Sequence, residues 1–320
     1  MNKSKKVIFV ILLLVSLAII GVAIMAIWGN RGNSSPVEDD DKFTVVTSFY
    51  PMYIAALNVT DGADINLYNL SEPETGCLHD YQLTTDDMKL LSNADVFIIN
   101  GLGMEAFLDD VMKQYPKLRI INASVGIESL NEPHSNEEDE NEEEHEHEEG
   151  HEHEGSNAHV WMSVANHIKQ VDNIRIGLRD ANPSNASLYN ENASNYISKL
   201  EQLKAKVDNS LNGKKVVLFS EAYEYLAKDF GLDVRAILDL DEEKNISARE
   251  IADTVDVVRK DQVPLIIAEK EYGEKMANAV MGETGIMSVY LDTIIRGEYD
   301  KDAYINRMNS NIDLLKEALK

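Results

Sequence analysis

The sequence predicts an α/β protein of two lobes, each a parallel four-stranded sheet flanked by helices, joined by one long linker helix. Short apolar, β-branched runs alternate with segments of helical spacing such as 85–93 and 248–260. Continuous apolar runs of this kind are typical of strands in parallel sheets that are covered on both faces. The runs form two sets of four, which indicates two similar lobes. The first set is 43–48, 64–70, 95–100 and 118–122, and the second is 214–220, 234–240, 264–269 and 287–291.

One long helix is predicted between the two sets of strands. Asn182 is suited to its N-cap, and Pro183 is suited to its first turn. Apolar residues follow at steps of four, three and four, and the pattern ends near Gly213; they are Tyr196, Leu200, Leu203 and Val207. An uninterrupted helix of about 28 residues would be about 42 Å long, which is enough to span both lobes. We therefore expect an N-terminal lobe at 43–182, a linker helix at 183–212 and a C-terminal lobe at 213–320.

The N-terminus is predicted to be a membrane anchor. Lysines at positions 3, 5 and 6 precede an uncharged, mostly apolar stretch at 7–28. That stretch exceeds the apolar region of a signal peptide, about 7–15 residues, and is long enough to cross a bilayer. We expect residues 1–29 to anchor the chain with the basic end inside, and a polar linker at 30–42 to lead to a domain on the extracellular face of the cytoplasmic membrane. A cleaved signal peptide is the alternative.

Charge and cysteine content exclude several classes of protein. The net charge of −26 argues against nucleic acid and against anionic membrane surfaces as partners. The single cysteine, Cys77, excludes an intrachain disulfide framework. An acidic excess fits cation binding, and it is also a common route to solubility.

An acidic, histidine-rich tract interrupts the first half of the chain. Residues 137–154 carry twelve carboxylates and four histidines, which are His145, His147, His151 and His153. Such a composition cannot bury enough apolar surface to offset its chain entropy, so we expect a disordered loop at 132–157. Imidazole and carboxylate are ligands of divalent metals, which indicates metal capture by the loop. A solvated acidic linker without a metal is the alternative.

Metal-binding residue types also stand where predicted strands end. His79 follows the second strand, and His159 follows the fourth strand and the acidic tract. Ser220 and Glu221 stand at the end of the fifth strand, and Asp292 stands at the end of the eighth. Open α/β sheets bind their ligands outside the carboxyl ends of the strands. Together these residues predict a metal site at that edge.

Several motifs make the chain resemble a known family. These motifs are VVTSFYPMY, HDY, AHVW, DANPSNASLYNENASNYISKLEQL and EAYEYLAKDFGL. They resemble the solute-binding proteins of zinc and manganese ABC importers, and the likeness runs from about residue 43 to the C-terminus. The resemblance implies two lobes bridged by a rigid helix, a metal in the cleft between them and little domain closure. It also implies an ABC permease that takes the metal, together with its ATPase. A His-rich acidic loop is similar to that of the zinc-type members.

The resemblance assigns ligands to particular residues. His79 and His159 match the first two metal histidines of the family, and Asp292 matches its last carboxylate. The third position, five residues before Tyr225, holds Ser220 where zinc-type members have histidine and manganese-type members have glutamate. Serine is a poor ligand for either metal, so Glu221 is the predicted third ligand, and three protein ligands plus water are the alternative.

Cys77 also departs from the family, because it replaces a small residue two positions before His79. As a thiolate it would suit zinc. As a thiol it would serve as a small buried hydrophobic residue.

Zinc is the favoured metal, and manganese is the alternative. A site with histidine binds zinc more strongly than manganese in the usual order of affinities, and the His-rich tract also favours zinc. Two carboxylates beside two histidines form a harder ligand set, which favours manganese.

The predicted function is the extracytoplasmic solute-binding component of a metal-ion ABC importer, and not an enzyme. A metal-dependent hydrolase is one alternative, since three ligands, a water and a general base would serve hydrolysis. The sequence lacks the H-E-x-x-H motif of one such class. An extracellular metal buffer is the other alternative, with residues 137–154 as its active element.

Overall fold

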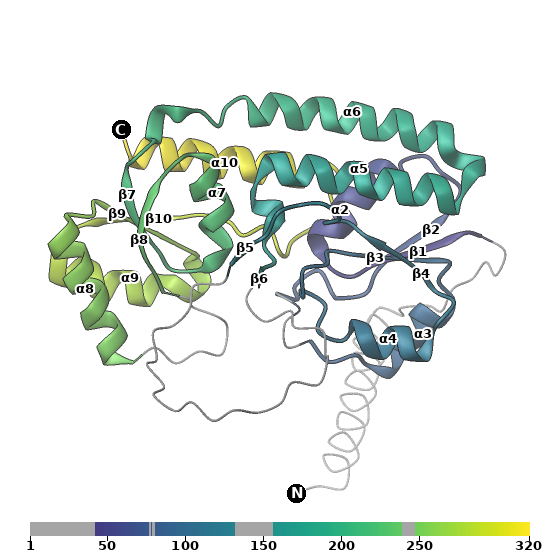
Figure 1. The fold of residues 1–320 in the computed structure, drawn as a ribbon, viewed down its shortest axis with the longest axis horizontal. Coiled ribbons are helices and arrows are strands. Elements are labelled where there is room, and N and C mark those ends of the chain that lie inside the picture. The colour runs from purple at the N-terminus through teal and green to yellow at the C-terminus, as the bar shows by residue number, and fades with distance from the viewer. Residues whose placement is uncertain (1–41, 77, 79–80, 132–155, 239–246) are drawn as a thin grey trace, which may run out of the picture. The chain divides into compact units, whose positions relative to one another are not determined.

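Two parallel four-stranded sheets organise the chain (Figure 1). The first has the order β2-β1-β3-β4, and the second has the order β10-β9-β7-β8. The strands of the first sheet are β1 (Thr44–Thr47), β2 (Asn66–Asn69), β3 (Val96–Ile99) and β4 (Arg119–Asn122). Those of the second are β7 (Lys215–Leu218), β8 (Asp233–Ile237), β9 (Leu265–Ala268) and β10 (Met287–Tyr290). All eight predicted strands and the predicted fold class are confirmed.

The two sheets share one topology. When the strands of each sheet are counted along the chain, their order across the sheet is second, first, third, fourth. Every neighbouring pair is parallel, so the carboxyl ends of all four strands meet at one edge. The strand order reverses between β1 and β3 and again between β7 and β9. These reversal points are where open α/β sheets bind ligands.

The computed structural model describes residues 42–76, 78, 81–131, 156–238 and 247–320. Residues 43–320 form one compact unit, separate from residues 1–42. Within the described ranges no helix is both long and apolar enough to cross a bilayer, and the predicted anchor at 7–28 lies outside them. Six predicted metal-binding residues also lie outside them: Cys77, His79, His145, His147, His151 and His153.

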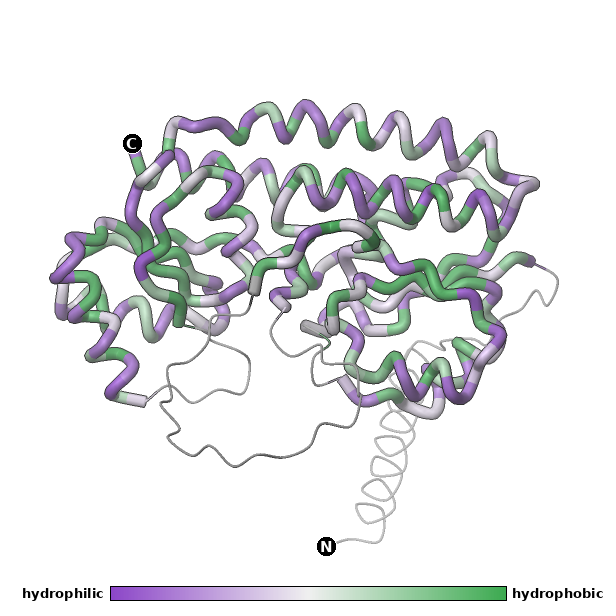
Figure 2. The backbone as a smooth tube through the Cα atoms, viewed as in Figure 1, coloured by the Kyte–Doolittle hydropathy of each residue, from purple (hydrophilic) through white to green (hydrophobic). Residues whose placement is uncertain are grey.

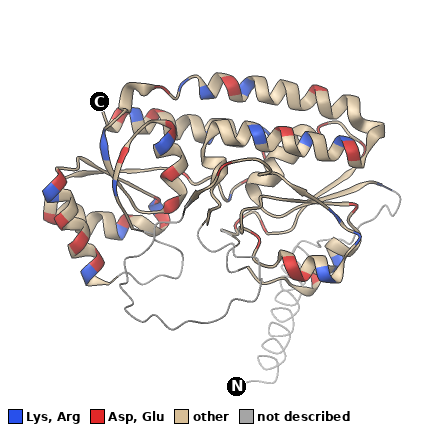
Figure 3. Ribbon diagram, in the orientation of Figure 1, with Lys and Arg blue, Asp and Glu red and all other residues tan. Residues whose placement is uncertain are grey.

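Helices pack on the sheets. Around the first sheet lie α2 (Tyr50–Val59), α3 (Thr85–Ser92), α4 (Leu108–Gln114) and α5 (Val164–Ala181), and around the second lie α7 (Glu224–Asp229), α8 (Ala248–Asp261), α9 (Lys270–Thr284) and α10 (Ala303–Ala318) (Figure 1). Capping boxes start two of them, Thr84 with Asp87 at α3 and Ser247 with Glu250 at α8. Charged residues gather on the helices, whereas the central strands carry few (Figure 3).

One large apolar cluster runs through both lobes. It contains residues of the first sheet such as Val45 and Ile98, and also Leu218 and Ile267 from one face of the second sheet. The opposite face of the second sheet packs with α8 and α9 in a smaller cluster that includes Phe219. Figure 2 shows the hydrophobic strands surrounded by more polar helices. The two sheets therefore share a core.

The linker helix is shorter than predicted. α6 (Ala186–Lys204) has 19 residues, so an uninterrupted helix over 183–212 is wrong in its extent. Pro183–Asn185 form a separate 3₁₀ turn before it. After it, the Asp208 carboxylate accepts a hydrogen bond from the Ser210 backbone N–H at 2.9 Å, which starts another turn. α6 nevertheless packs against α2 and α10, and so contacts helices of both lobes.

The base of the acidic tract is a pair of short strands. β5 (Leu130–Asn131) pairs antiparallel with β6 (Ser156–Asn157). The predicted disordered loop at 132–157 therefore extends two residues too far, because Ser156 and Asn157 are in a strand. The remainder of that prediction falls on residues outside the described ranges.

A buried histidine lies where α5, α6 and α10 meet. His167 is fully buried, its ring stacks on Tyr304 at 3.8 Å between centroids, and it meets Tyr196 edge-on at 6.2 Å. Its Nδ1 lies 3.4 Å from the amide oxygen of Gln170, and among the described residues its Nε2 has no hydrogen-bond partner. Burial lowers the pKa of His167 to about 4, because the charged imidazolium would lose its hydration.

We predict that this histidine makes the fold sensitive to acid. A histidine with a pKa near 4 in the folded state and about 6.5 in the unfolded state does not lower the free energy of unfolding above pH 6.5. Stability then falls as the pH drops towards 4, by on the order of 3 kcal/mol. In His167→Phe the difference between the unfolding free energies at pH 7 and pH 4.5 should shrink by a large part of that amount. Urea unfolding of both proteins at the two pH values measures it, and parallel losses would contradict the prediction.

Candidate metal centre

Two of the predicted site residues, one from each lobe, are in contact. Nδ1 of His159 lies 3.2 Å from Oε1 of Glu221, and the two side chains are only 5% and 12% exposed. His159 directly precedes the 3₁₀ turn Val160–Met162, which leads into α5. Glu221 opens the 3₁₀ turn Glu221–Tyr223 beyond β7. Imidazole and carboxylate thus meet at the carboxyl edge of the second sheet.

The Asn157 side chain orients both of these residues. Its Oδ1 accepts a hydrogen bond from the His159 backbone N–H at 3.0 Å and lies 3.1 Å from His159 Nδ1. Its Nδ2 donates to the Glu221 carbonyl at 2.9 Å and to Oε2 of Glu224 at 2.8 Å. With two acceptor oxygens beside Nδ1, the ring proton belongs on Nδ1, which leaves the lone pair on Nε2.

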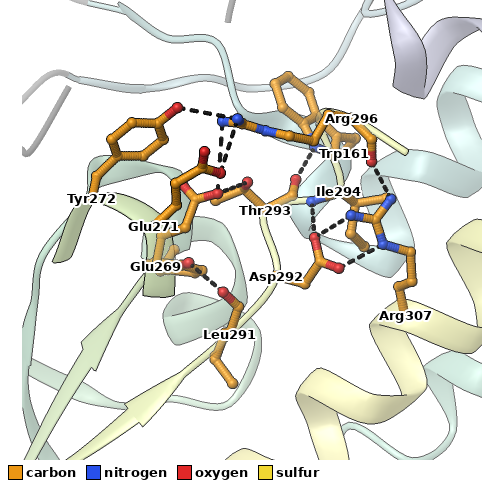
Figure 4. A network of polar contacts seen from close by, with 11 residues as sticks. Trp161, Glu269, Glu271, Tyr272, Leu291, Asp292, Thr293, Ile294, Arg296 and Arg307 are labelled. Atoms are coloured by element: carbon orange, nitrogen blue, oxygen red, sulfur yellow. Dashed lines mark hydrogen bonds and ion pairs between the residues drawn. The ribbon is translucent and has the colours of Figure 1, made fainter. Parts of the chain in front are cut away.

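The segment that carries Asp292 is tied to both other segments. Tyr223, two residues after Glu221, donates its buried hydroxyl to the Leu291 carbonyl at 2.8 Å. Trp161, two residues after His159, donates its indole N–H to the Thr293 carbonyl at 2.9 Å (Figure 4). The carbonyls on either side of Asp292 are therefore fixed by the neighbours of the other two candidates. These bonds hold the three segments together.

The Asp292 carboxylate has an arginine partner. Arg307 on α10 binds it through two nitrogens, with Nε 2.5 Å from Oδ2 and Nη2 2.6 Å from Oδ1 (Figure 4). The backbone N–H of Ile294 also donates to Oδ1, at 2.7 Å. Asn311 binds the backbone N–H and the backbone carbonyl of Asp292 through its amide. Asp292 is thus held in one orientation by groups of its own lobe.

Ser220 caps the turn that follows β7. Its hydroxyl accepts a hydrogen bond from the Ala222 backbone N–H at 3.2 Å. An extended residue whose side chain accepts from a free backbone N–H of the following turn is a typical N-cap. The residue before Glu221 therefore has a local structural role.

A buried carboxylate at the edge of the first sheet supports the His159 segment. Glu105 accepts hydrogen bonds from the Ser48 hydroxyl at 2.7 Å and from the backbone N–H groups of Asn100 and Gly101 at 2.7 and 3.0 Å. Burial raises the pKa of Glu105, and these hydrogen bonds oppose the shift. Asn100 in turn donates its amide to the Ala158 carbonyl at 3.0 Å. The loops beyond β1 and β3 thereby fix the backbone directly before His159.

Glu269, at the end of β9, is a further acidic group near Asp292. The Thr293 hydroxyl donates to its Oε1 at 3.2 Å, and Nη2 of Arg296 lies 3.9 Å from the same oxygen. Burial raises the pKa of Glu269, whereas the Arg296 charge lowers it. Glu269 ends the predicted strand 264–269, and it lies at the same carboxyl edge of the sheet as the other strand-end residues.

The full set of predicted ligands is not present in the described part of the chain. There, no three His, Cys, Asp or Glu side chains lie close enough together to hold a metal ion. His159 and Glu221 are in contact, Asp292 is bound to Arg307, and His79 and Cys77 lie outside the described ranges. Sequence analysis missed Asn157, Tyr223, Trp161 and Arg307. Only Asn157 carried a signal, as a hydrogen-bonding residue two positions before a candidate ligand.

Known proteins match the chain over almost all of its described length. A family model described as zinc-uptake complex component A, periplasmic (ZnuA), matches residues 45–318. The high-affinity zinc uptake system protein ZnuA of Bacillus subtilis is 32% identical over 307 residues, which cover 92% of this chain and 94% of that protein. The manganese-binding lipoprotein MntA of Halalkalibacterium halodurans is 24% identical and covers 95% of this chain and 97% of its own.

Solved structures share the fold. Zn(II)-bound AdcA from Streptococcus pneumoniae superposes with a TM-score of 0.70 at 26% identity, over 87% of this chain and 58% of AdcA. The solute-binding protein FpvC of Pseudomonas aeruginosa, in complex with Ni²⁺, has a TM-score of 0.73 at 22% identity, over 87% of this chain and 97% of FpvC. Because the family model matches residues 45–318, this chain belongs to the family of zinc-uptake complex component A.

Proposed function

We propose that this protein is the extracytoplasmic solute-binding component of a metal-ion ABC importer, and that its cargo is Zn²⁺. The observation that carries the proposal is the buried contact between His159 and Glu221, one residue from each lobe. A histidine ring whose Nδ1 faces acceptors presents Nε2 to a metal, and zinc favours such nitrogen and carboxylate ligands. The zinc uptake protein at 32% identity supports zinc. Mn²⁺ is the second candidate, supported by the acidic groups at the site and by the manganese-binding relative.

The proposed ligands are His79, His159, Glu221 and Asp292. Nδ1 and Nε2 point in different directions from the His159 ring, so Glu221 would exchange its contact with Nδ1 for the ion when His159 binds through Nε2. Ser220 is left out, because its hydroxyl already caps the turn. Cys77 is placed near the site only by its distance of two residues from His79. In this proposal the two sheets keep a fixed relation when the ion binds, because they share an apolar cluster.

The proposed partners are a membrane permease and its ATPase, which would take the ion from the protein. The N-terminal segment is proposed to anchor the chain, and residues 43–182, 183–212 and 213–320 to form the two lobes and the linker between them. The acidic composition fits a protein that collects cations.

The purified protein should contain one tightly bound zinc ion per chain. In the double variant His79→Ala, His159→Ala that ion should be lost, because two nitrogen ligands are removed, while the far-UV circular dichroism spectrum stays unchanged. Elemental analysis after dialysis and titration with Zn²⁺ measure the effect. Undiminished tight binding by the double variant would contradict the assignment, and unchanged metal content in His167→Phe serves as the control for loss of a histidine elsewhere.

Glu221 and Ser220 are predicted to differ in their effect on zinc affinity. Glu221→Gln keeps the size but removes the charge beside a dication, so affinity should fall at least about tenfold, roughly 1.4 kcal/mol. Ser220→Ala should change affinity little, because the hydroxyl serves the turn. Ser220→His should tighten zinc binding by supplying a third imidazole. Competition titrations with a chelator measure all three, and equal effects of Glu221→Gln and Ser220→Ala would argue against the proposed third ligand.

Deletion of residues 137–154 should leave the tight site intact. A polyanionic tract raises the local concentration of cations and so speeds capture, an effect that fades with salt. The deletion should therefore slow zinc association at low ionic strength and remove several weak sites. Stopped-flow capture at two salt concentrations measures this. Loss of the tight site together with the tract would favour a metal buffer over an importer component.

A further inference from the structure

The carboxylate of Asp292 is held by a cation that belongs to the protein itself. Arg307 makes the two-nitrogen contact that matches carboxylate geometry, at 2.5 and 2.6 Å. The third hydrogen bond, from the Ile294 backbone N–H, fixes the same carboxylate from the side. Ile294 has a φ of 58°, a left-handed conformation that a β-branched residue seldom adopts. The turn at 292–294 is thus shaped around this carboxylate (Figure 4).

Arg307 has other partners beside Asp292. Its Nη1 donates to the Arg296 carbonyl, and its guanidinium carbon lies 5.5 Å from the centre of the Tyr50 ring, in a cation–π arrangement. Gly297, with a φ of 134°, leaves room for this group, since a Cβ there would lie 3.0 Å from Nη1. If Asp292 were taken from it, the guanidinium would keep these two contacts and would not be left as an isolated charge.

The pair is accessible enough to exchange partners. The Arg307 side chain is 25% exposed and the Asp292 side chain is 37% exposed, so neither charge would be stranded in a dry interior. The carbonyls before and after Asp292 are also fixed by Tyr223 and Trp161, which lie two residues after Glu221 and His159. A cation that arrives at these residues therefore meets a carboxylate that is positioned but already occupied by an arginine.

We propose that Arg307 sets the metal affinity of the site by competing with the cargo for Asp292, so that binding exchanges a guanidinium for a metal ion. This inference rests on the proposed function. Only the fraction of molecules in which Arg307 has released Asp292 binds the ion with its full ligand set, and the apparent affinity is reduced by that fraction. If Arg307 occupies Asp292 in about nine molecules of ten, the reduction is about tenfold.

The test uses the purified full-length chain with Zn²⁺ alone as the probe. Arg307→Gln removes the competing cation and should tighten Zn²⁺ binding about tenfold. Arg296→Gln is the matched control. It removes the same charge from the loop that carries Asp292, but the printed contacts of Arg296 are with Glu269, Glu271 and Tyr272. Its effect through space should stay below about threefold. The double variant Arg307→Gln, Asp292→Asn should bind no more tightly than Asp292→Asn alone.

Arg307→Lys is a second variant for the case that Arg307→Gln does not fold. It keeps the charge but loses the two-nitrogen contact, so its Zn²⁺ affinity should lie between those of the unaltered protein and Arg307→Gln. A readout that does not depend on affinity is the Arg307 Nε–H resonance in ¹⁵N-arginine-labelled protein, which should shift when Zn²⁺ saturates the site. Equal affinities of Arg307→Gln and Arg296→Gln, or an unmoved Nε–H resonance at saturation, would overturn the inference. If the unaltered protein bound no Zn²⁺ tightly, the proposed function itself would fail.

Discussion

The packing of one face of the second sheet into the apolar cluster of the first determines how the two lobes meet. Leu218, Ile267 and Val289 of the second sheet belong to the same cluster as Val45 and Ile98 of the first. Burial of that face excludes water over a large area, which is the dominant stabilising term in such a fold. A hinge between the sheets would have to expose this surface. The carboxyl edges of both sheets are thus held at a fixed relation, as a site shared between lobes requires.

Within that frame a few polar contacts place the candidate ligands. Asn157 contacts His159 and Glu221 through one amide, and the Tyr225 hydroxyl donates to the Asn157 carbonyl at 2.7 Å. Buried polar groups of this kind are costly unless every donor and acceptor is satisfied, and satisfied networks specify one arrangement. The His159 ring therefore has a defined tautomer and direction before any ion arrives. Preorganisation of this sort reduces the entropy that binding must overcome.

The fold was largely predictable because its signals are local in sequence. Runs such as Val96–Ile99 and Leu265–Ala268 are buried on both faces, so they read as continuous apolar segments. The end of α6 at Lys204 was not predictable from spacing, because Leu203 and Val207 continue the helical pattern while Asp208 captures a backbone N–H outside it. The pairing of β5 with β6 was missed because two residues per strand carry no periodicity.

The site was predictable only in part, for a related reason. Strand ends drew attention to Glu221 and Asp292, since parallel strands place their carboxyl ends at one edge, whereas His159 follows the short antiparallel strand β6. The partners of these residues depend on three-dimensional contacts: Arg307 lies fifteen residues beyond Asp292, on a helix whose buried face is formed by residues such as Tyr304 and Met308. No spacing rule connects a strand end with a position in the second turn of a following helix.

The segment after Asp292 explains how its arginine could leave without loosening the lobes. Beyond Ile294 the chain crosses onto the first lobe, where the Gly297 N–H donates to the Pro73 carbonyl at 2.9 Å and Tyr299 packs on Tyr53 at 4.0 Å between ring centres. The Asn58 amide donates to the Lys301 carbonyl at 2.9 Å. These contacts involve neither the Asp292 carboxylate nor the guanidinium. A change of partner at Asp292 is therefore confined to side chains, while the backbone that carries it stays fixed to both lobes.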